Sequence, residues 1–137
     1  MDDRLALLLT AICTGALLVA AGWLLMRVAR KAAEGTLRRN HLAGIRTRVT
    51  LSSDAAWQTA HLAAQRDSLR GARGLIVGGI GGAVSGVLGF VGFSFPATVT
   101  VFTVITLGAT VWTLFWTLKG LAVGQRAAVE AAQLRNR

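Results

Sequence analysis

Two long stretches without a charged residue constrain this chain more than any other feature of its sequence. Leu5 to Met26 contains 22 residues and Gly74 to Leu118 contains 45, and neither includes Asp, Glu, Lys or Arg. Apolar runs longer than about 18 residues are typical of membrane-spanning helices. A soluble domain would carry charges on every element that it exposes, and a disordered chain would be less hydrophobic than 53% apolar. Both of these classes are therefore excluded.

The lengths of the two stretches predict three membrane spans. A helix rises about 1.5 Å per residue, so the first stretch reaches about 33 Å, enough to cross hydrocarbon about 30 Å thick. The second stretch is too long for one crossing and must fold back. The expected turn is at Phe93 to Pro96, because Ser94 can cap a helix and Pro96 suits a first helical turn. We predict an all-α membrane protein with a single domain, residues 1–137, and three transmembrane helices at about 5–26, 75–93 and 97–118.

The distribution of charge predicts the orientation. Residues 27–74 hold ten Lys or Arg against three acids, and residues 119–137 hold four against one, whereas the N-terminus has a small negative charge. Three spans place the loop 27–74 and the tail on the same side, and basic segments stay in the cytoplasm. We predict a multi-pass protein of the bacterial cytoplasmic (inner) membrane, with its N-terminus outside and its C-terminus cytoplasmic. This asymmetry also explains the net charge of +9 without a nucleic-acid partner.

Small residues recur on the second predicted span with the spacing of a helix face. The candidate packing residues are Gly78, Gly82, Ser85, Gly86 and Gly89. Small residues on one face allow another helix to approach closely, which promotes helix association in lipid. Two interpretations stay open: the face packs against the other two spans, or it docks a partner membrane protein.

Threonines form a similar face on the third predicted span, at positions Thr103, Thr106, Thr110, Thr113 and Thr117. In a membrane helix such hydroxyls usually bond a carbonyl one turn back on the same helix. The alternative is a bond across helices, to Ser85 or to a partner subunit. No ionisable residue lies in any predicted span, and this argues against a proton relay or an ion-coupled transport site.

The basic cytoplasmic loop is too long to be a simple connector. We expect the first helix to continue to about Glu34 and to end at Gly35. A second helix is expected from about Ser53 to Leu69, because the polar residues before it can cap its N-terminus. This helix is predicted to lie in the headgroup layer as an interfacial helix, or to pack under the bundle.

A pattern of polar, glycine and aromatic residues runs through the loop. Its members are Asn40, Gly44, Ile45, Arg46, Thr47, Thr50, Leu51, Ser52, Ser53, Trp57 and His61. In these residues the sequence resembles the SdpI family of bacterial membrane proteins, named after an immunity protein against a secreted toxic peptide. The resemblance covers 22 residues directly and departs from the family at Arg48 and Val49, where many members have Pro-Trp. It implies a membrane protein that captures a membrane-active peptide.

The loop motif supplies the candidate binding residues for a partner or for anionic lipid headgroups. These are Asn40, Gly44, Arg46, Thr47, Thr50, Ser52, Asp54, Trp57 and His61. Gly44 permits a left-handed turn, and Arg46 can bind a phosphate or a helix carboxyl end. The alternative is that these residues only fix the loop, with Arg46 bonding backbone carbonyls.

Catalytic chemistry has little support in the sequence. Asp54 and His61 lie seven residues apart with two serines nearby, but both serines occupy positions expected of helix caps. Cys13, the single cysteine, lies in the first predicted span, and two histidines alone make a weak metal site. We expect no enzyme activity, no catalytic residue, no metal and no cofactor.

The sequence therefore predicts a non-catalytic membrane protein that acts by helix–helix association. The preferred role is an accessory or stabilising subunit of a larger membrane complex, such as a transporter. The alternative is an immunity or sensing protein that binds a membrane-active toxic peptide, and a third interpretation is binding to anionic lipid.

Overall fold

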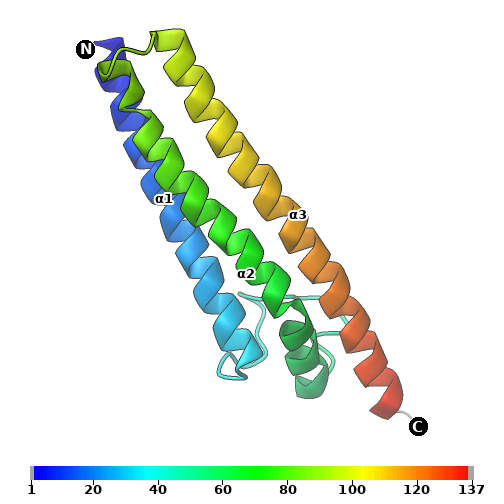
Figure 1. The fold of residues 1–137 in the computed structure, drawn as a ribbon. Coiled ribbons are helices and arrows are strands. Elements are labelled where there is room, and N and C mark those ends of the chain that lie inside the picture. The colour runs from blue at the N-terminus through cyan, green and yellow to red at the C-terminus, as the bar shows by residue number, and fades with distance from the viewer. Residues whose placement is uncertain (1, 136–137) are drawn as a thin grey trace. The chain divides into compact units, whose positions relative to one another are not determined.

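The computed structural model describes residues 2–135, and among them it contains three long α-helices, one short 3-10 helix and no strand (Figure 1). The elements in order are α1 (Asp3–Ala33), α2 (Asp54–Ser85), η1 (Leu88–Phe90) and α3 (Phe95–Arg135). Each α-helix is long and apolar enough to cross a membrane. The prediction of an all-helical, three-span membrane protein is confirmed.

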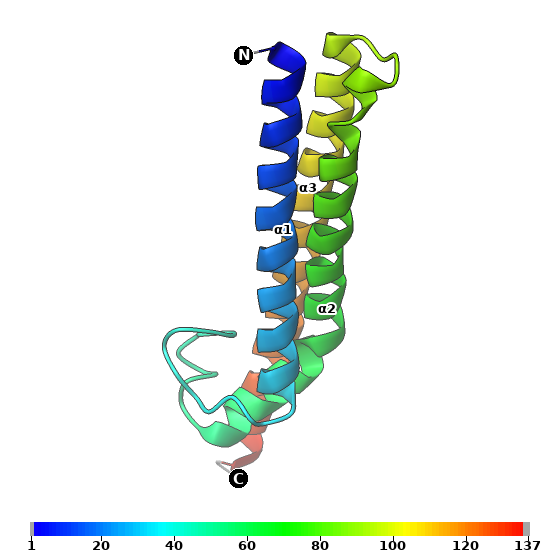
Figure 2. The ribbon, with the colours of Figure 1, turned by 90° about the vertical axis from the view of Figure 1, so that its left-hand side faces the viewer.

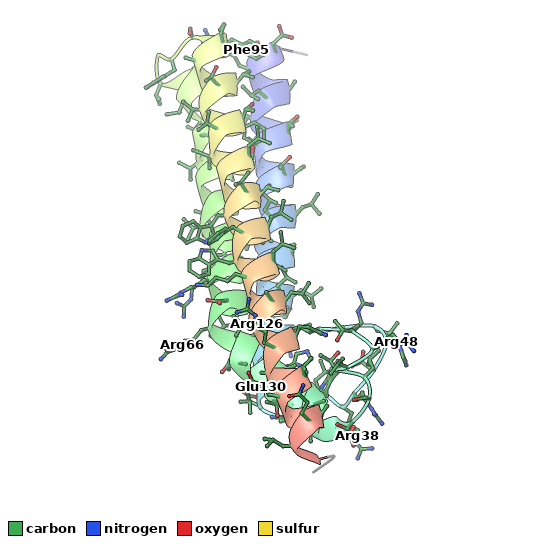
Figure 3. All side chains as sticks on the ribbon, turned by 90° about the vertical axis from the view of Figure 1, so that its right-hand side faces the viewer. Arg38, Arg48, Arg66, Phe95, Arg126 and Glu130 are labelled. Atoms are coloured by element: carbon green, nitrogen blue, oxygen red, sulfur yellow. The ribbon has the colours of Figure 1, made fainter. Side chains whose placement is uncertain are left out.

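The chain divides into two compact units, to which all three α-helices contribute. The span unit comprises Met1–Trp23 and Ala72–Thr113, and the loop unit comprises Leu24–Gly71 and Leu114–Arg137. The loop unit thus contains both the loop and the C-terminal part of α3, whereas the span unit contains the N-terminal part of α1 and the turn before α3. The labelled side chains Arg38, Arg48, Arg66, Arg126 and Glu130 all belong to the loop unit (Figure 3).

The ends of the helices follow from local chemistry. α1 has Asp3 in its first turn and basic residues in its last turn, which complement the helix dipole. Gly35, with a φ of 73°, adopts the left-handed conformation that ends a helix. Ser94 precedes α3, and its side-chain oxygen accepts a hydrogen bond from the amide of Ala97 at 3.4 Å.

α2 differs from the sequence prediction both in where it begins and in where it ends. The helix expected from about Ser53 to Leu69 is not a separate element, because α2 runs without interruption from Asp54 to Ser85. No proline interrupts this stretch, and its Ala, Gln, Leu and Arg residues favour a helix. The span predicted to reach position 93 instead leaves the α-helix at Ser85, where three glycines follow within seven residues. The interfacial position of residues 54–69 stays a prediction.

Glycines of α2 allow both α1 and α3 to pack closely against α2 within the span unit. A Cβ atom added to Gly79 would lie 2.7 Å from the backbone oxygen of Gly15 in α1, and one added to Gly78 would meet the Cβ of Ala109 in α3. The other small residues face the same two helices: Gly82 contacts Thr106, Gly86 contacts Ala11 and Gly89 approaches Thr98. The small residues of α2 and of the segment that follows it are therefore covered by helices of the same chain.

Hydroxyl groups in the span unit bond to their own helices. The Oγ1 atoms of Thr106, Thr110 and Thr113 donate to the carbonyls of Phe102, Thr106 and Ala109 at 2.9, 2.9 and 2.8 Å. Ser85 donates in the same way to the carbonyl of Gly82 at 2.7 Å. Lipid offers no hydrogen-bond partner, so these hydroxyl groups are satisfied by carbonyls of their own helix.

Two glycines of α3, Gly120 and Gly124, pack against α2 in the loop unit. Buried alanines at positions 56, 60 and 128 form the small apolar core of this unit. A Cβ atom added to Gly124 would lie 2.8 Å from the carbonyl oxygen of Ala60, and one added to Gly120 would lie 3.5 Å from that of Ala64. The sequence did not predict this contact, because Gly120 and Gly124 lie beyond the third predicted span and far along the chain from Ala60 and Ala64.

Candidate functional site

His61 on α2 bonds through both of its ring nitrogens, one to its own helix and the other to the loop. Nδ1 lies 2.8 Å from the carbonyl oxygen of Trp57, and Nε2 lies 2.8 Å from the amide nitrogen of Ile45. A carbonyl can only accept a hydrogen bond and an amide can only donate one, so the ring is neutral with its proton on Nδ1. Burial lowers the pKa of His61, although the hydrogen bond to Trp57 opposes this effect.

Gly44 lies directly against the His61 and Trp57 rings. Its φ of 94° is in the left-handed region, and an added Cβ atom would meet Nε2 of His61 and lie 3.1 Å from Cη2 of Trp57. The Trp57 and His61 ring centroids are 4.2 Å apart. Trp57 is also held by its indole N–H, which donates to the carbonyl of Leu37 at 3.1 Å. Glycine is therefore required at position 44 for backbone conformation and for space.

The threonines and serine of the motif fold the turn before α2. Thr50 is completely buried, its Oγ1 accepts from the amide of Thr47 at 2.9 Å, and it lies 2.8 Å from the carbonyl oxygen of Ile45. Ser52 donates to the carbonyl of Val49 at 2.7 Å. These bonds occupy groups that the sequence had suggested for binding a partner.

The side chains of Asn40 and Asp54 form contacts within other parts of the loop. The side-chain oxygen of Asn40 accepts from the amides of Leu42 and Ala43 at 2.8 and 2.9 Å, which closes a local turn. Asp54, at the start of α2, forms an ion pair with Arg39 at 3.3 Å. That pair is exposed on both sides, so its contribution to stability is small.

Arg46 bonds to backbone carbonyls of the loop. Its Nη1 atom donates to His41 at 2.9 Å and to Leu42 at 3.4 Å. Both bonds use the same nitrogen, and within residues 2–135 no acceptor is bonded to its Nε or Nη2. A large part of its hydrogen-bonding capacity therefore remains for a ligand.

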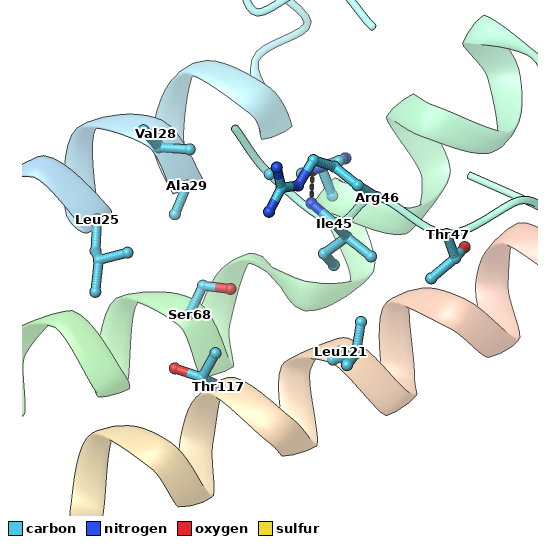
Figure 4. A pocket seen from close by; sticks show the side chains of 11 residues that line it. Leu25, Val28, Ala29, Ile45, Arg46, Thr47, Ser68, Thr117 and Leu121 are labelled. Carbon is cyan, nitrogen blue, oxygen red and sulfur yellow. Dashed lines mark hydrogen bonds between the residues drawn. The ribbon is translucent and has the colours of Figure 1, made fainter. Parts of the chain in front are cut away.

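Four of the candidate binding residues line a cavity of about 410 Å³ in the loop unit (Figure 4). They are Gly44, Arg46, Thr47 and His61, and Ile45, a further member of the loop pattern, joins them. The helices supply the remaining walls: Leu25, Val28 and Ala29 from α1, Ser68 from α2, and Thr117 and Leu121 from α3. The other motif residues, Asn40, Thr50, Ser52, Asp54 and Trp57, do not line the cavity and instead support the loop that closes it.

A buried carboxylate near the ends of the spans was also missed by the sequence analysis. Asp67 is only 8% exposed, and it lies 3.3 Å from Arg70 and 4.0 Å from Lys119. Both cations lie 4.6 Å from the centre of the Trp116 ring. The cluster joins α2 to α3 by charge and by cation–π contacts. Asp67 and Arg70 lie on α2, far in sequence from Trp116 and Lys119 on α3, so no local motif marks the cluster.

A groove in the span unit is the second concave surface of interest. It has a volume of about 570 Å³ and is lined by α1 and α2. Half of its lining residues are small, and they are Gly15, Ala16, Ala20, Gly79 and Ala83. Ile12, Val19, Trp23, Ile80 and Val84 complete it. Small side chains at a groove allow a further helix to approach closely in lipid.

Metal-binding groups do not come together in the part of the chain that the structure describes. Across residues 2–135 no cluster of three or more His, Cys, Asp or Glu side chains could hold a metal ion. The two serines beside Asp54 have local partners, since Ser53 accepts from the amide of Ala56 at 3.1 Å and Ser52 bonds Val49.

Comparison with known proteins identifies the family. No curated protein and no solved structure was found to match the chain. The sequence model of the SdpI/YfhL protein family matches residues 36–119, which is more than half of the chain and includes the loop motif, α2 and most of the third span. The chain, a multi-pass membrane protein by its three spans, belongs to the SdpI/YfhL protein family.

Proposed function

We propose that this protein is a non-catalytic protein of the bacterial inner membrane that acts by helix association and captures a membrane-active peptide, in an immunity or sensing role. Its N-terminus faces outward and its loop and C-terminus face the cytoplasm, as the basic residues of the loop favour. Membership of the SdpI/YfhL family supports this role, because the family takes its name from an immunity protein.

The groove between α1 and α2 is the observation that carries this proposal. Ala16 and Ala20 are exposed within it, next to the exposed aliphatic side chains of Ile80 and Val84. A membrane-active peptide that becomes helical in lipid can place its backbone against the alanines and its apolar side chains against the rims. Such a groove can bind the peptide by apolar packing, without a hydrogen bond from a polar side chain.

Filling the groove tests the proposal. A sensitive bacterium that expresses the chain is challenged with a secreted membrane-active peptide, and survival is counted over a concentration series. We expect Ala20→Phe to abolish protection, because the new ring occupies the groove. Ala21→Phe is the matched control, since Ala21 is the neighbouring exposed residue of α1 and does not line the groove. Equal survival with and without the chain would reject the immunity role.

A larger membrane complex, such as a transporter, is the second candidate partner, with the chain as an accessory or stabilising subunit. Thr103 and Thr110 favour it, because they lie seven residues apart on α3 and are both exposed in the span unit. Exposed hydroxyls in lipid can bond across helices. Native electrophoresis of mildly solubilised membranes tests this role, and a chain that migrates only as a monomer, both as wild type and with these two threonines changed to valine, would contradict it.

A further inference from the structure

The cavity of the loop unit lies where the helices pass from uncharged to charged sequence. On α1, Leu25 belongs to the uncharged stretch, whereas Val28 and Ala29 follow Arg27, the first basic residue after that stretch. On α3, Thr117 precedes Lys119 and Leu121 follows it. Membrane helices change composition in this way at the level of the lipid headgroups. The cavity is therefore at the depth of lipid phosphates and of the first carbons of the acyl chains.

The lining combines an apolar wall with a cation and hydroxyls. Leu25, Val28, Ile45 and Leu121 supply the apolar wall, and no acidic residue contributes to the lining. Ser68, Thr117 and Thr47 add hydroxyl groups, and Arg46 lies beside Ile45 at the cavity (Figure 4). An apolar cavity of this size with a few convergent polar groups is typical of a small-molecule site.

Arg46 can bind an anion in this position. Its two backbone bonds leave Nε and Nη2 for a ligand, and a guanidinium binds phosphate oxygens through two parallel hydrogen bonds. The excess of basic residues in the loop also attracts anions to this part of the protein. His61, the other titratable residue of the lining, already accepts a hydrogen bond from the loop at Nε2, so Arg46 is the group of the lining that can bind the anion.

We propose that this cavity binds one anionic phospholipid, with the phosphate at Arg46 and the upper part of an acyl chain against Leu25, Val28 and Leu121. The remainder of the lipid stays in the bilayer. The site is separate from the peptide groove and does not depend on the proposed immunity role. The loop motif of the family then serves two purposes: it folds the loop, and it presents Arg46 to a lipid at the ends of the spans.

Native mass spectrometry of the full-length chain in detergent tests this site, with phosphatidylglycerol and phosphatidylcholine as the added lipids. We expect one phosphatidylglycerol molecule to remain bound at concentrations where phosphatidylcholine does not. Arg46→Gln should weaken this binding about tenfold, as the loss of charge-assisted hydrogen bonds predicts. Arg48→Gln is the matched control, because it removes the same charge two residues away and does not line the cavity. Its effect should be less than about twofold, in line with a surface charge.

A second variant tests the cavity without a change of charge. Ala29→Leu fills part of the apolar wall and should reduce retention of phosphatidylglycerol while Arg46 is intact. Competition with inorganic phosphate distinguishes a lipid site from a general anion site. Equal losses for Arg46→Gln and Arg48→Gln, full retention by Ala29→Leu, or complete displacement by millimolar phosphate would each overturn the proposal.

Discussion

The amide of Ile45 donates a 2.8 Å hydrogen bond to Nε2 of His61, sixteen residues later in the chain. This bond, dashed in Figure 4, fastens the loop segment that forms one wall of the cavity to α2. Figure 2 shows the loop, in cyan, between the end of α1 and the start of α2. Because the same ring donates through Nδ1 to Trp57, the His61 side chain can serve both partners only in its neutral form. The protonation state of one histidine is thus coupled to the closure of the loop.

Acid should release this loop. Burial lowers the pKa of His61 from its ordinary value of 6.5, so the unfolded chain takes up the proton before the folded chain does. The contribution of neutral His61 to the free energy of unfolding is complete above pH 6.5, and it is lost as the pH falls through the lowered pKa of this residue. A proton on Nε2 would also face the Ile45 N–H, which is itself a donor. Hydrogen exchange at the Ile45 amide, corrected for its intrinsic rate, should therefore accelerate below that range.

His41→Gln is the control for the acid effect, because His41 is an exposed histidine of the same loop. The acceleration should persist in His41→Gln. Constant protection of the Ile45 amide on acidification would show that His61 titration does not control the loop.

Gly44→Ala should destabilise the loop unit by about 1–3 kcal/mol, because the backbone is left-handed and a Cβ atom would press on His61. Gly92→Ala is the matched control, since Gly92 also has a positive φ, of 103°, but has nothing within 4 Å of an added Cβ. The free energy of unfolding in detergent, measured by denaturant titration, should fall more for Gly44→Ala. Equal losses would mean that the contact with His61 and Trp57 contributes nothing.

Gly78→Ala should weaken packing between α2 and α3, because the new methyl group would collide with Ala109. Overpacking of this kind costs about 1–3 kcal/mol. Gly108→Ala, on α3, meets nothing within 4 Å and should be neutral or slightly stabilising. Thermal unfolding in the same detergent separates the two variants, and a higher melting temperature for Gly78→Ala than for Gly108→Ala would contradict the observed helix contact.

Asp67→Asn should loosen the attachment of α2 to α3 in the loop unit. The change keeps the shape of the side chain but removes the carboxylate that faces Arg70 and Lys119. We expect a loss of about 1–3 kcal/mol in unfolding free energy, the usual range when a buried group loses a charged partner. Glu130→Gln removes an exposed carboxylate of α3 and should change stability little. An unchanged unfolding curve for Asp67→Asn would show that the cluster is not stabilising.

The sequence was sufficient for features that depend on length, charge and local backbone chemistry. The two uncharged stretches predicted the three spans, and Gly35 and Ser94 lie at helix ends as their local preferences indicate. The loop motif led to Gly44, Arg46, Thr47 and His61, four of the residues that line the cavity. These are properties of neighbouring residues or of simple composition.

Features that depend on tertiary contact could not be predicted from the sequence. Leu25, Ser68 and Leu121 carry no motif, and they reach the same cavity only because three helices meet there. The continuity of α2 was not predicted, because no proline or other clear break separates the helix expected over 53–69 from the second span. The packing of Gly124 on Ala60 likewise joins residues that are far apart in the chain.

Accessibility labelling of single cysteines tests the central claim that three spans place the loop in the cytoplasm. In a Cys13→Ser background, Leu42→Cys marks the loop, where Leu42 is 89% exposed, and Phe93→Cys marks the turn before α3. A membrane-impermeant maleimide added to intact spheroplasts should label Phe93→Cys and should label Leu42→Cys only after lysis. Labelling of Leu42→Cys in intact spheroplasts would contradict the account.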